Sequence, residues 1–235
     1  MILDIQFFGG RGSSSSNATR GGIKVKTVIT SSGQEVKLTN PLIYGKDDPN
    51  LTGERRQIIE EFEKRRGKAK IEYGLILDAN GNVITENKGS KSSVKFARSH
   101  LDQTKDITHI HPRGKGEEGY IGGTFSEADT NMFTAYSNIT TMRAKAAEGT
   151  YSISKGKNFN GKGFKDYLKD QRKINENKQR MTQKKLAEQY YKDRDYNKYK
   201  QGLSTAFNDF LVDQHNSLLK GAKTYGYDYT LERKK

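Results

Sequence analysis

Two histidines separated by one residue, His109 and His111, are the side chains of this 235-residue chain best suited to chemistry. They lie in a segment that we expect to be an extended β-strand, where alternate side chains point to the same face, so both imidazoles can contact one metal ion. Ser126 and Asp129 are three residues apart and share one face of a predicted helix, from which Asp129 supplies a third ligand. Two imidazoles and a carboxylate with an open fourth position suit a catalytic zinc site. A base is still needed, and Glu72 is the candidate.

The order of these residues resembles a known signature. A glutamate, then His-x-His-Pro, then Ser-x-x-Asp is similar to the metalloprotease motif of the JAB/MPN (JAMM) superfamily. The segment from Glu72 to Ile84, Glu-Tyr-Gly-Leu-Ile-Leu-Asp-Ala-Asn-Gly-Asn-Val-Ile, resembles the opening strand and hairpin of its RadC-like bacterial branch. The similarity covers residues 54–153. The family has a short gap between the second histidine and the serine, whereas this chain carries an insertion at 113–124.

The resemblance implies an α+β fold with a mixed sheet flanked by helices, Zn²⁺ as cofactor, and cleavage of peptide or isopeptide bonds. Zinc lowers the pKa of a coordinated water to about 7. In this interpretation Glu72 accepts the proton of that water and passes it to the leaving amine. Ser126 donates a hydrogen bond to the oxyanion that develops on the substrate carbonyl.

Each of these residues also has a structural interpretation without chemistry. A His-x-His pair occurs in polar strands that bind no metal, and Glu72 can be a solvated charge at the start of a strand. Ser126 can cap a helix, a role compatible with a contact to substrate. We expect His100 and His215 on the surface, outside the ligand set.

Composition limits the classes of protein that remain. Hydrophobic residues make up 32% of the chain, too few for one compact core along its whole length. The net charge of +14 favours contact with nucleic acid or another polyanion. The absence of cysteine excludes disulfides, thiolate zinc sites and thiol nucleophiles. We find no apolar run of membrane-spanning length and no secretory signal, and we expect synthesis in the bacterial cytoplasm.

The chain divides into four expected segments. Residues 1–22 form an apolar anchor followed by a flexible Gly/Ser-rich tether, and 23–53 form a hairpin and connector. Residues 54–154 form the JAB/MPN-like domain and 155–235 a basic helical tail. Residues 1–10 also resemble the termini of tailed-bacteriophage head and portal-associated proteins, which implies phage structural proteins as partners and incorporation in a virion.

Local patterns predict individual elements within these segments. We expect the first helix to be capped by Thr52, a hairpin turn at Asn80-Gly81, and chain breaks at Pro41 and Gly202. The predicted helices cover 54–66, 94–101, 126–136, 164–199 and 204–219. The predicted strands cover 23–30, 35–38, 72–77, 82–86, 106–111, 142–147 and 150–153, and residues 224–229 are expected to be extended.

Three functions follow from these observations. The first is a zinc-dependent hydrolase with a peptide or protein substrate, in a phage virion-associated protein. The second is a non-enzymatic phage minor structural protein that uses a JAB-like fold as a scaffold. The third is a nucleic-acid-binding or processing protein whose basic tail lies along phosphates, with tyrosines such as Tyr190 and Tyr199 stacking on unpaired bases. Metal content distinguishes the first two, and salt-dependent DNA affinity identifies the third.

Overall fold

The computed structural model describes residues 22–30, 32–46, 48, 51–112 and 120–233. The predicted anchor at 1–10, the tether that follows it and the stretch 113–119 of the insertion lie outside these residues.

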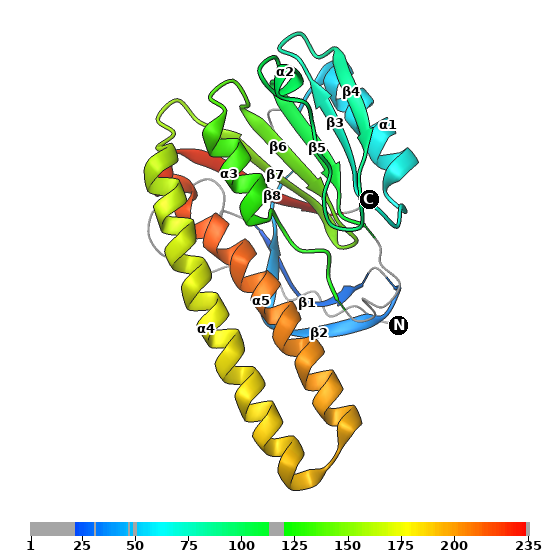
Figure 1. Cartoon of the computed structure of the whole chain (residues 1–235), viewed down its shortest axis with the longest axis vertical. Helices are drawn as coiled ribbons and strands as arrows, with labels where there is room; N and C mark the ends of the chain where they lie inside the picture. The colour runs from blue at the N-terminus through cyan, green and yellow to red at the C-terminus, as the bar shows by residue number, and fades with distance from the viewer. Residues whose placement is uncertain (1–21, 31, 47, 49–50, 113–119, 234–235) are drawn as a thin grey trace.

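A six-stranded mixed sheet forms the centre of the fold, with strand order β4-β3-β5-β6-β7-β8 (Figure 1). The neighbours β5 and β6 are parallel, and every other neighbouring pair is antiparallel. The strands are β3 (Tyr73–Leu77), β4 (Val83–Lys88), β5 (Asp106–Ile110), β6 (Thr141–Lys145), β7 (Gly149–Lys155) and β8 (Tyr227–Arg233). The predicted α+β class, a mixed sheet flanked by helices, is confirmed.

Helices cover the two faces of this sheet because its strands carry apolar side chains on both sides. Helix α1 (Gly53–Arg66) places Ile59 and Phe62 against Leu75, Leu77 and Ile110 on one face. The other face packs against α3 (Glu127–Ala135), α4 (Gly161–Asp193) and α5 (Tyr196–Tyr225). The parallel pair β5 and β6 requires a crossover connection, and α3 lies within it.

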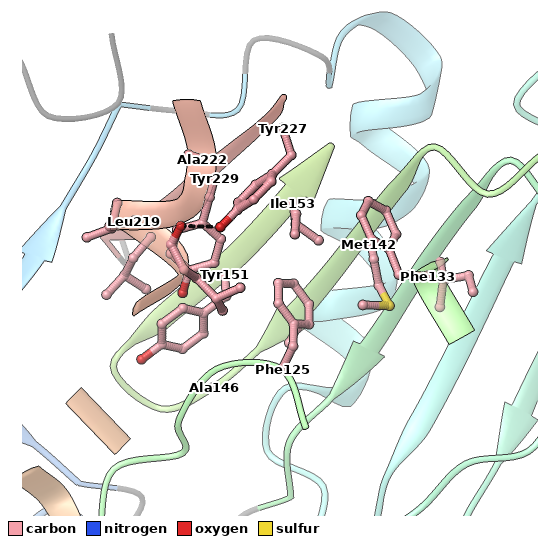
Figure 2. Close-up of a cluster of buried hydrophobic side chains, with 14 of the residues drawn as sticks. Phe125, Phe133, Met142, Ala146, Tyr151, Ile153, Leu219, Ala222, Tyr227 and Tyr229 are labelled. Atoms are coloured by element: carbon pink, nitrogen blue, oxygen red, sulfur yellow. Dashed lines mark hydrogen bonds between the residues drawn. The ribbon is translucent and has the colours of Figure 1, made fainter. Parts of the chain in front are cut away.

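Aromatic side chains fill the space between the sheet and α5. Figure 2 shows Tyr151 from β7, Phe125 from the segment before α3, and Tyr227 and Tyr229 from β8 gathered beside Leu219 of α5. The side chain of Tyr151 has no measurable exposure. Aromatic residues of this size bury large apolar areas, so this cluster fixes α5 on the sheet.

The C-terminal segment is part of the same sheet. Strand β8 pairs with β7 from Gly149↔Arg233 to Lys155↔Tyr227, and its side chains share the core formed by residues before 154. The sheet therefore continues across the position at which the sequence suggested a boundary between domain and tail. None of the helices in the described ranges has the length and apolar composition of a membrane span.

The predicted break at Gly202 is wrong. Residue 202 lies inside α5, and the turn between α4 and α5 is at Arg194, which adopts a left-handed φ of 56°, and Asp195, whose side chain caps α5. A Cβ atom at 202 would lie 2.5 Å from a methyl group of Leu186 on α4. The glycine is a point of close helix–helix approach, which sequence spacing alone does not distinguish from a break.

Two other predicted elements differ in the structure. Residues 94–101 were expected to be helical, but only α2 (Arg98–Leu101) is, because Phe96 packs over the bare backbone of Gly74 and the Lys95 carbonyl accepts a hydrogen bond from Asn87. The side chain of Thr52 occupies the N-cap position of α1 without making the capping hydrogen bond.

Pro41 does not break the chain as predicted. Strand β2 (Glu35–Tyr44) runs through it and pairs with β1 (Ile23–Ile29) in a separate two-stranded sheet. The register shifts between Val25 and Thr27, opposite the proline, so an irregularity accommodates its missing N–H group. This hairpin packs on α5, where the Asp209 carboxylate accepts a hydrogen bond from the Thr39 backbone.

A buried ionic network lies on the α1 face of the sheet. The Arg143 guanidinium is 3.1 Å from Asp48, 3.2 Å from Glu232 and 3.8 Å from Glu63, and it also donates to Ser152. Burial lowers the pKa of Arg143, but the three carboxylates outweigh it and the net direction is upward. The network joins α1, β6 and β8.

Candidate metal centre

His109 and His111 are positioned by β5. His109 pairs with Gly74 of β3 on one side and with Ala144 of β6 on the other, so its imidazole stands over two small residues in the middle of the sheet. His111 follows the strand, and its N–H continues the ladder with a hydrogen bond to the Lys145 carbonyl. The alternation of side chains along the strand then puts both imidazoles on the face covered by α3.

Asp129 is positioned by the first turn of α3. Ser126 is the N-cap residue, and its Oγ accepts from the Asp129 N–H at 3.2 Å. The Asp129 carboxylate returns two bonds, accepting from the Ser126 N–H at 2.8 Å and from the Ser126 hydroxyl at 2.6 Å. This reciprocal capping box fixes the rotamer of Asp129 and directs its Oδ2 towards His109.

The three side chains converge within the range of a single ion. The Nε2 atoms of His109 and His111 are 3.0 Å apart, and His109 Nε2 lies 3.7 Å from Asp129 Oδ2. Ligand atoms on a tetrahedral zinc lie about 3.3 Å from one another, a value that the two distances bracket. One ligand atom from each residue lies within 4.8 Å of the other two. His109, His111 and Asp129 can therefore hold a metal ion.

The protonation states also suit a cation. Burial lowers the pKa of His109 to about 4, against the opposing pull of Asp129, so this imidazole is neutral at pH 7. Burial acts to raise the pKa of the Asp129 carboxyl. His109, the Ser126 hydroxyl and His111 lower it by more, so the net pKa is below its usual value. The donor set is thus two imidazoles and one ionised carboxylate.

The tautomer of His111 follows from its partners. Its Nδ1 lies 3.1 Å from the Gly122 carbonyl oxygen and 3.0 Å from that of Gly123. Carbonyl oxygens only accept, so Nδ1 carries a proton and donates it. In the neutral ring Nε2 then has a free lone pair, and Nε2 is the atom that faces His109.

Glu72 lies near enough to two of the ligands, His111 and Asp129, for their charges to act on its carboxyl. It precedes β3 and extends the pairing of that strand, since its N–H donates to the Ser90 carbonyl and its carbonyl accepts from Gly89. Burial raises the pKa of its carboxyl, and the negative Asp129 acts in the same direction, while His111 and a hydrogen bond from the Val94 backbone oppose them. A raised carboxyl pKa is a property of glutamates that act as general bases.

Ser126 lies close to the ligands, and its hydroxyl is already hydrogen-bonded to one of them, Asp129. Its hydroxyl proton is donated to Asp129 Oδ2, the same oxygen that approaches His109. The observed role of Ser126 is therefore to cap α3 and orient Asp129. Its predicted contact with a substrate oxyanion stays a prediction.

The prediction of a solvent-facing His215 is wrong. This residue is fully buried in α5, with Nδ1 2.9 Å from the Tyr229 hydroxyl and Nε2 3.1 Å from the Ile43 carbonyl. Because a carbonyl accepts, Nε2 donates and Nδ1 accepts from the tyrosine. Burial lowers the pKa of His215 to about 3. It connects α5 to β2 and β8 and lies outside the ligand set.

The described end of the insertion is anchored to α5. The Ile121 N–H donates to the Asn208 side chain at 3.0 Å, and the rings of Tyr120 and Phe207 are in edge contact at 4.8 Å. Gly122 and Gly123 then donate their N–H groups to Glu148, at 2.8 Å each. The predicted strands 142–147 and 150–153 place Glu148 only between two strands, because no spacing in the chain links it to the histidines.

No protein-family model matches the sequence, and neither a curated protein nor a solved structure matches it. The relationship to the JAB/MPN superfamily stays a prediction from the motif residues.

Proposed function

We propose that this chain is a zinc-dependent hydrolase of peptide or isopeptide bonds. The observation that carries the proposal is the convergence of His109, His111 and Asp129 on one point, with the Glu72 carboxyl near enough to be affected by the charges of His111 and Asp129. A metal site without a neighbouring base would suit a structural ion equally well. A raised-pKa glutamate next to an incomplete ligand set is instead typical of hydrolytic centres.

Zinc is the metal that we propose, because two neutral imidazoles and one carboxylate leave an open coordination position of the kind found in catalytic zinc sites. When bound, the metal supplies a Lewis acid that makes a water acidic near neutral pH. The same donor set also suits Fe²⁺, so metal analysis of the purified protein distinguishes the two.

Each residue of the chain has a proposed role. Glu72 takes the proton of the attacking water and returns it to the leaving amine, for which its raised pKa is suited. Asp129 and the two imidazoles hold the metal. Ser126 keeps Asp129 oriented, and its hydroxyl is the proposed hydrogen-bond donor to the oxyanion of the substrate. The choice of peptide and isopeptide bonds rests on the resemblance of the motif.

The test compares the wild-type protein with Glu72→Gln, both loaded with one equivalent of Zn²⁺. Panels of fluorogenic peptides and of lysine-linked isopeptides serve as substrates. We expect zinc-dependent cleavage by the wild type and a loss of 10²–10⁴-fold in Glu72→Gln, the usual contribution of a general base. Zinc content should be equal in the two proteins. Equal activity in both would contradict the role of Glu72.

A second function, polyanion binding, is favoured by the far end of the α4–α5 hairpin, which extends beyond the sheet (Figure 1). This end carries exposed tyrosines at Tyr191, 68% exposed, and Tyr196, 63% exposed, and the rings of Tyr190 and Tyr199 are stacked 5.1 Å apart. Basic residues lie on the same two helices and at the turn between them, at Lys178, Arg180, Lys184, Lys185, Lys192, Arg194, Lys198 and Lys200. We propose that single-stranded nucleic acid contacts this surface.

Nucleic-acid binding is tested with a labelled single strand at several salt concentrations. We expect the logarithm of the affinity to fall linearly with the logarithm of the salt concentration, and the slope to decrease when Lys184 and Lys185 are replaced by Gln. Replacing Lys24 and Lys26 on β1 serves as the charge-matched control. An unchanged slope in the helix variant would assign the contact to another surface.

The third candidate is a phage minor structural protein that uses this fold without catalysis. It rests on the resemblance of residues 1–10, which lie outside the described part of the chain. A folded protein that binds no metal and associates with phage head or portal proteins would favour it over the hydrolase.

A further inference from the structure

Glu148 is a buried carboxylate that the proposed hydrolysis does not use. Its side chain is 6% exposed. One carboxylate oxygen accepts from the Gly122 N–H at 2.8 Å, and the other accepts from the Gly123 N–H at 2.8 Å and from the Tyr151 hydroxyl at 2.7 Å. The ring of Tyr151 lies in the aromatic cluster between the sheet and α5 (Figure 2). The carboxylate is therefore held rigidly by the core.

The backbone carbonyl groups of the same two glycines contact His111, one of the candidate metal ligands. Their carbonyl oxygens accept from His111 Nδ1 at 3.1 and 3.0 Å. Glu148 thus holds the N–H groups of a two-residue segment whose C=O groups hold the imidazole. The chain of contacts from the core to the metal ligand consists of Tyr151, Glu148, the glycine pair and His111.

The glycines are required for this arrangement. A Cβ atom at Gly122 would lie 2.6 Å from the Ala146 side chain and 3.3 Å from the Glu148 carboxylate. Gly123 has a φ of +74°, and a Cβ there would lie 2.9 Å from Leu211. Any side chain would force the segment away from Glu148, and the two carbonyls would move with it.

We propose that Glu148 is a positioning residue for the metal centre. By holding the carbonyls of Gly122 and Gly123 next to His111 Nδ1, Glu148 keeps the imidazole proton on that nitrogen. The inference rests on the metal-binding part of the proposed function and goes beyond it by assigning the control of the ligand tautomer. With Nδ1 protonated, the Nε2 lone pair is the one presented to the metal. Partners of this kind orient metal-bound histidines, and their removal commonly reduces metal affinity by 10–100-fold.

The first experiment uses the metal-free protein and records the tautomer of His111 by ¹⁵N NMR of the imidazole nitrogens. We expect the Nδ1–H form in the wild type. In Glu148→Gln, one of the two glycine N–H groups faces an amide NH₂ that cannot accept, so the segment loosens and the spectrum shows a mixture of tautomers. A purely structural role for Glu148 would leave the tautomer unchanged.

The second experiment measures zinc affinity by competition with a chromophoric chelator. We expect a 10–100-fold loss in Glu148→Gln. Tyr44→Phe is the matched control, because it removes the hydrogen bond from the Tyr44 hydroxyl to the backbone carbonyl of Glu148 and leaves the contacts of the carboxylate in place. That variant should lose stability and keep the tautomer and the affinity of the wild type.

The proposal stays testable if Glu148→Gln does not fold. Glu148→Asp keeps the charge but is one methylene too short to reach both glycine N–H groups, and it should shift the tautomer in the same direction. In the wild type alone, the Gly122 and Gly123 amides should be protected from hydrogen exchange. Rapid exchange of both amides, or a folded variant at position 148 with the wild-type tautomer and affinity, would overturn the proposal.

The outcomes separate this inference from the proposed function. The tautomer and the exchange of the two amides are measured without metal and without substrate. A wild-type protein that binds no zinc but shows the Nδ1–H tautomer, lost on mutation of Glu148, would reject the hydrolase and keep the link between Glu148 and His111.

Discussion

The Nε2 atoms of His109 and His111 face each other at 3.0 Å. Two lone pairs at this distance would repel, so in the metal-free protein one of the two nitrogens carries a proton. Since Gly122 and Gly123 fix the proton of His111 on Nδ1, His109 Nε2 is the donor and the Asp129 carboxylate lies 3.7 Å beyond it. Coordination through His109 Nε2 would therefore require the neutral ring to carry its single proton on Nδ1 instead, so metal binding should switch the tautomer of His109.

The change of tautomer can be observed directly. In the metal-free protein at pH 7, ¹⁵N NMR of the imidazole nitrogens should show His109 protonated at Nε2 and His111 protonated at Nδ1. Addition of one equivalent of Zn²⁺ should move the His109 proton to Nδ1 and leave the tautomer of His111 unchanged, because His111 Nε2 already has a free lone pair. A His109 ring that carries its proton on Nδ1 before metal is added would contradict the assigned tautomers.

The Glu72 carboxyl should titrate above its usual range in the metal-free protein. Burial raises its pKa above the usual 4.5, and the negative Asp129 acts in the same direction. ¹³C NMR of the side-chain carboxyls from pH 3 to 8, with Glu72→Gln to assign the signal, gives the midpoint. Addition of Zn²⁺ should lower it, because the charge of the ion favours the carboxylate. A midpoint at or below 4.5 in the metal-free protein would contradict the burial of the proposed base.

Ser126→Ala should affect stability and metal affinity together. The variant loses the cap of α3, which costs about 1 kcal/mol of the free energy of unfolding. It also loses the hydrogen bond that orients Asp129, so zinc affinity should fall. Denaturant unfolding and chelator competition measure the two effects. Ser137→Ala, beyond the end of α3, provides a serine control that should leave zinc affinity unchanged.

His215 should make the stability of the protein pH-dependent. Its pKa is about 3 in the folded protein and about 6.5 when unfolded, so between these values only the unfolded chain binds the proton. Stability is therefore full above pH 6.5 and falls as the pH is lowered towards 3, by up to about 1.4 kcal/mol per pH unit for this group.

The variant His215→Gln isolates this contribution. It should be less stable than the wild type at pH 7, because it perturbs the contacts to Tyr229 and Ile43. Its stability should nevertheless decrease less steeply below pH 6.5. Urea unfolding at pH 7, 6 and 5 gives both slopes. Equal slopes in the two proteins would mean that His215 is not buried in its neutral form.

Arg143→Met should be strongly destabilising, because it removes the cation shared by the buried Asp48 and the partly buried Glu63 and Glu232, of which Glu63 keeps its pair with Lys145. Loss of one partner of a buried ionic group costs about 3–5 kcal/mol. Arg66→Met is the control, since its ion pair with Glu86 is partly exposed and should contribute less than about 1 kcal/mol. Denaturant midpoints compare the two variants, and similar small losses in both would show that the network is not needed for stability.

Much of the candidate site could be predicted because its determinants are local. The alternation of a strand places His109 and His111 together, and the three-residue spacing in α3 links Ser126 to Asp129. Both are properties of a single element. The insertion between His111 and Ser126 does not prevent convergence, because its described end turns back through Gly122 and Gly123 towards His111.

The remaining features depend on contacts between distant segments. In the sequence Gly202 resembles a helix breaker, because its close approach to Leu186 of the neighbouring helix exists only in the folded protein. His215 lies in a helix of mixed polarity, and only the approach of β2 and β8 buries it. In the sequence Glu148 lies between two predicted strands. Its hydrogen-bond partners, Gly123 and Gly122, are 25 and 26 positions earlier, in an insertion without a periodic pattern.

The most direct test of the account is the zinc content of the purified protein after dialysis against a small excess of Zn²⁺, measured by mass spectrometry of the metal. We expect close to one zinc per chain in the wild type and in His100→Ala, whose histidine lies outside the ligand set. His109→Ala and Asp129→Ala should remain folded and lose the ion. A wild-type protein without metal, or ligand variants that retain a full equivalent, would contradict the proposed centre.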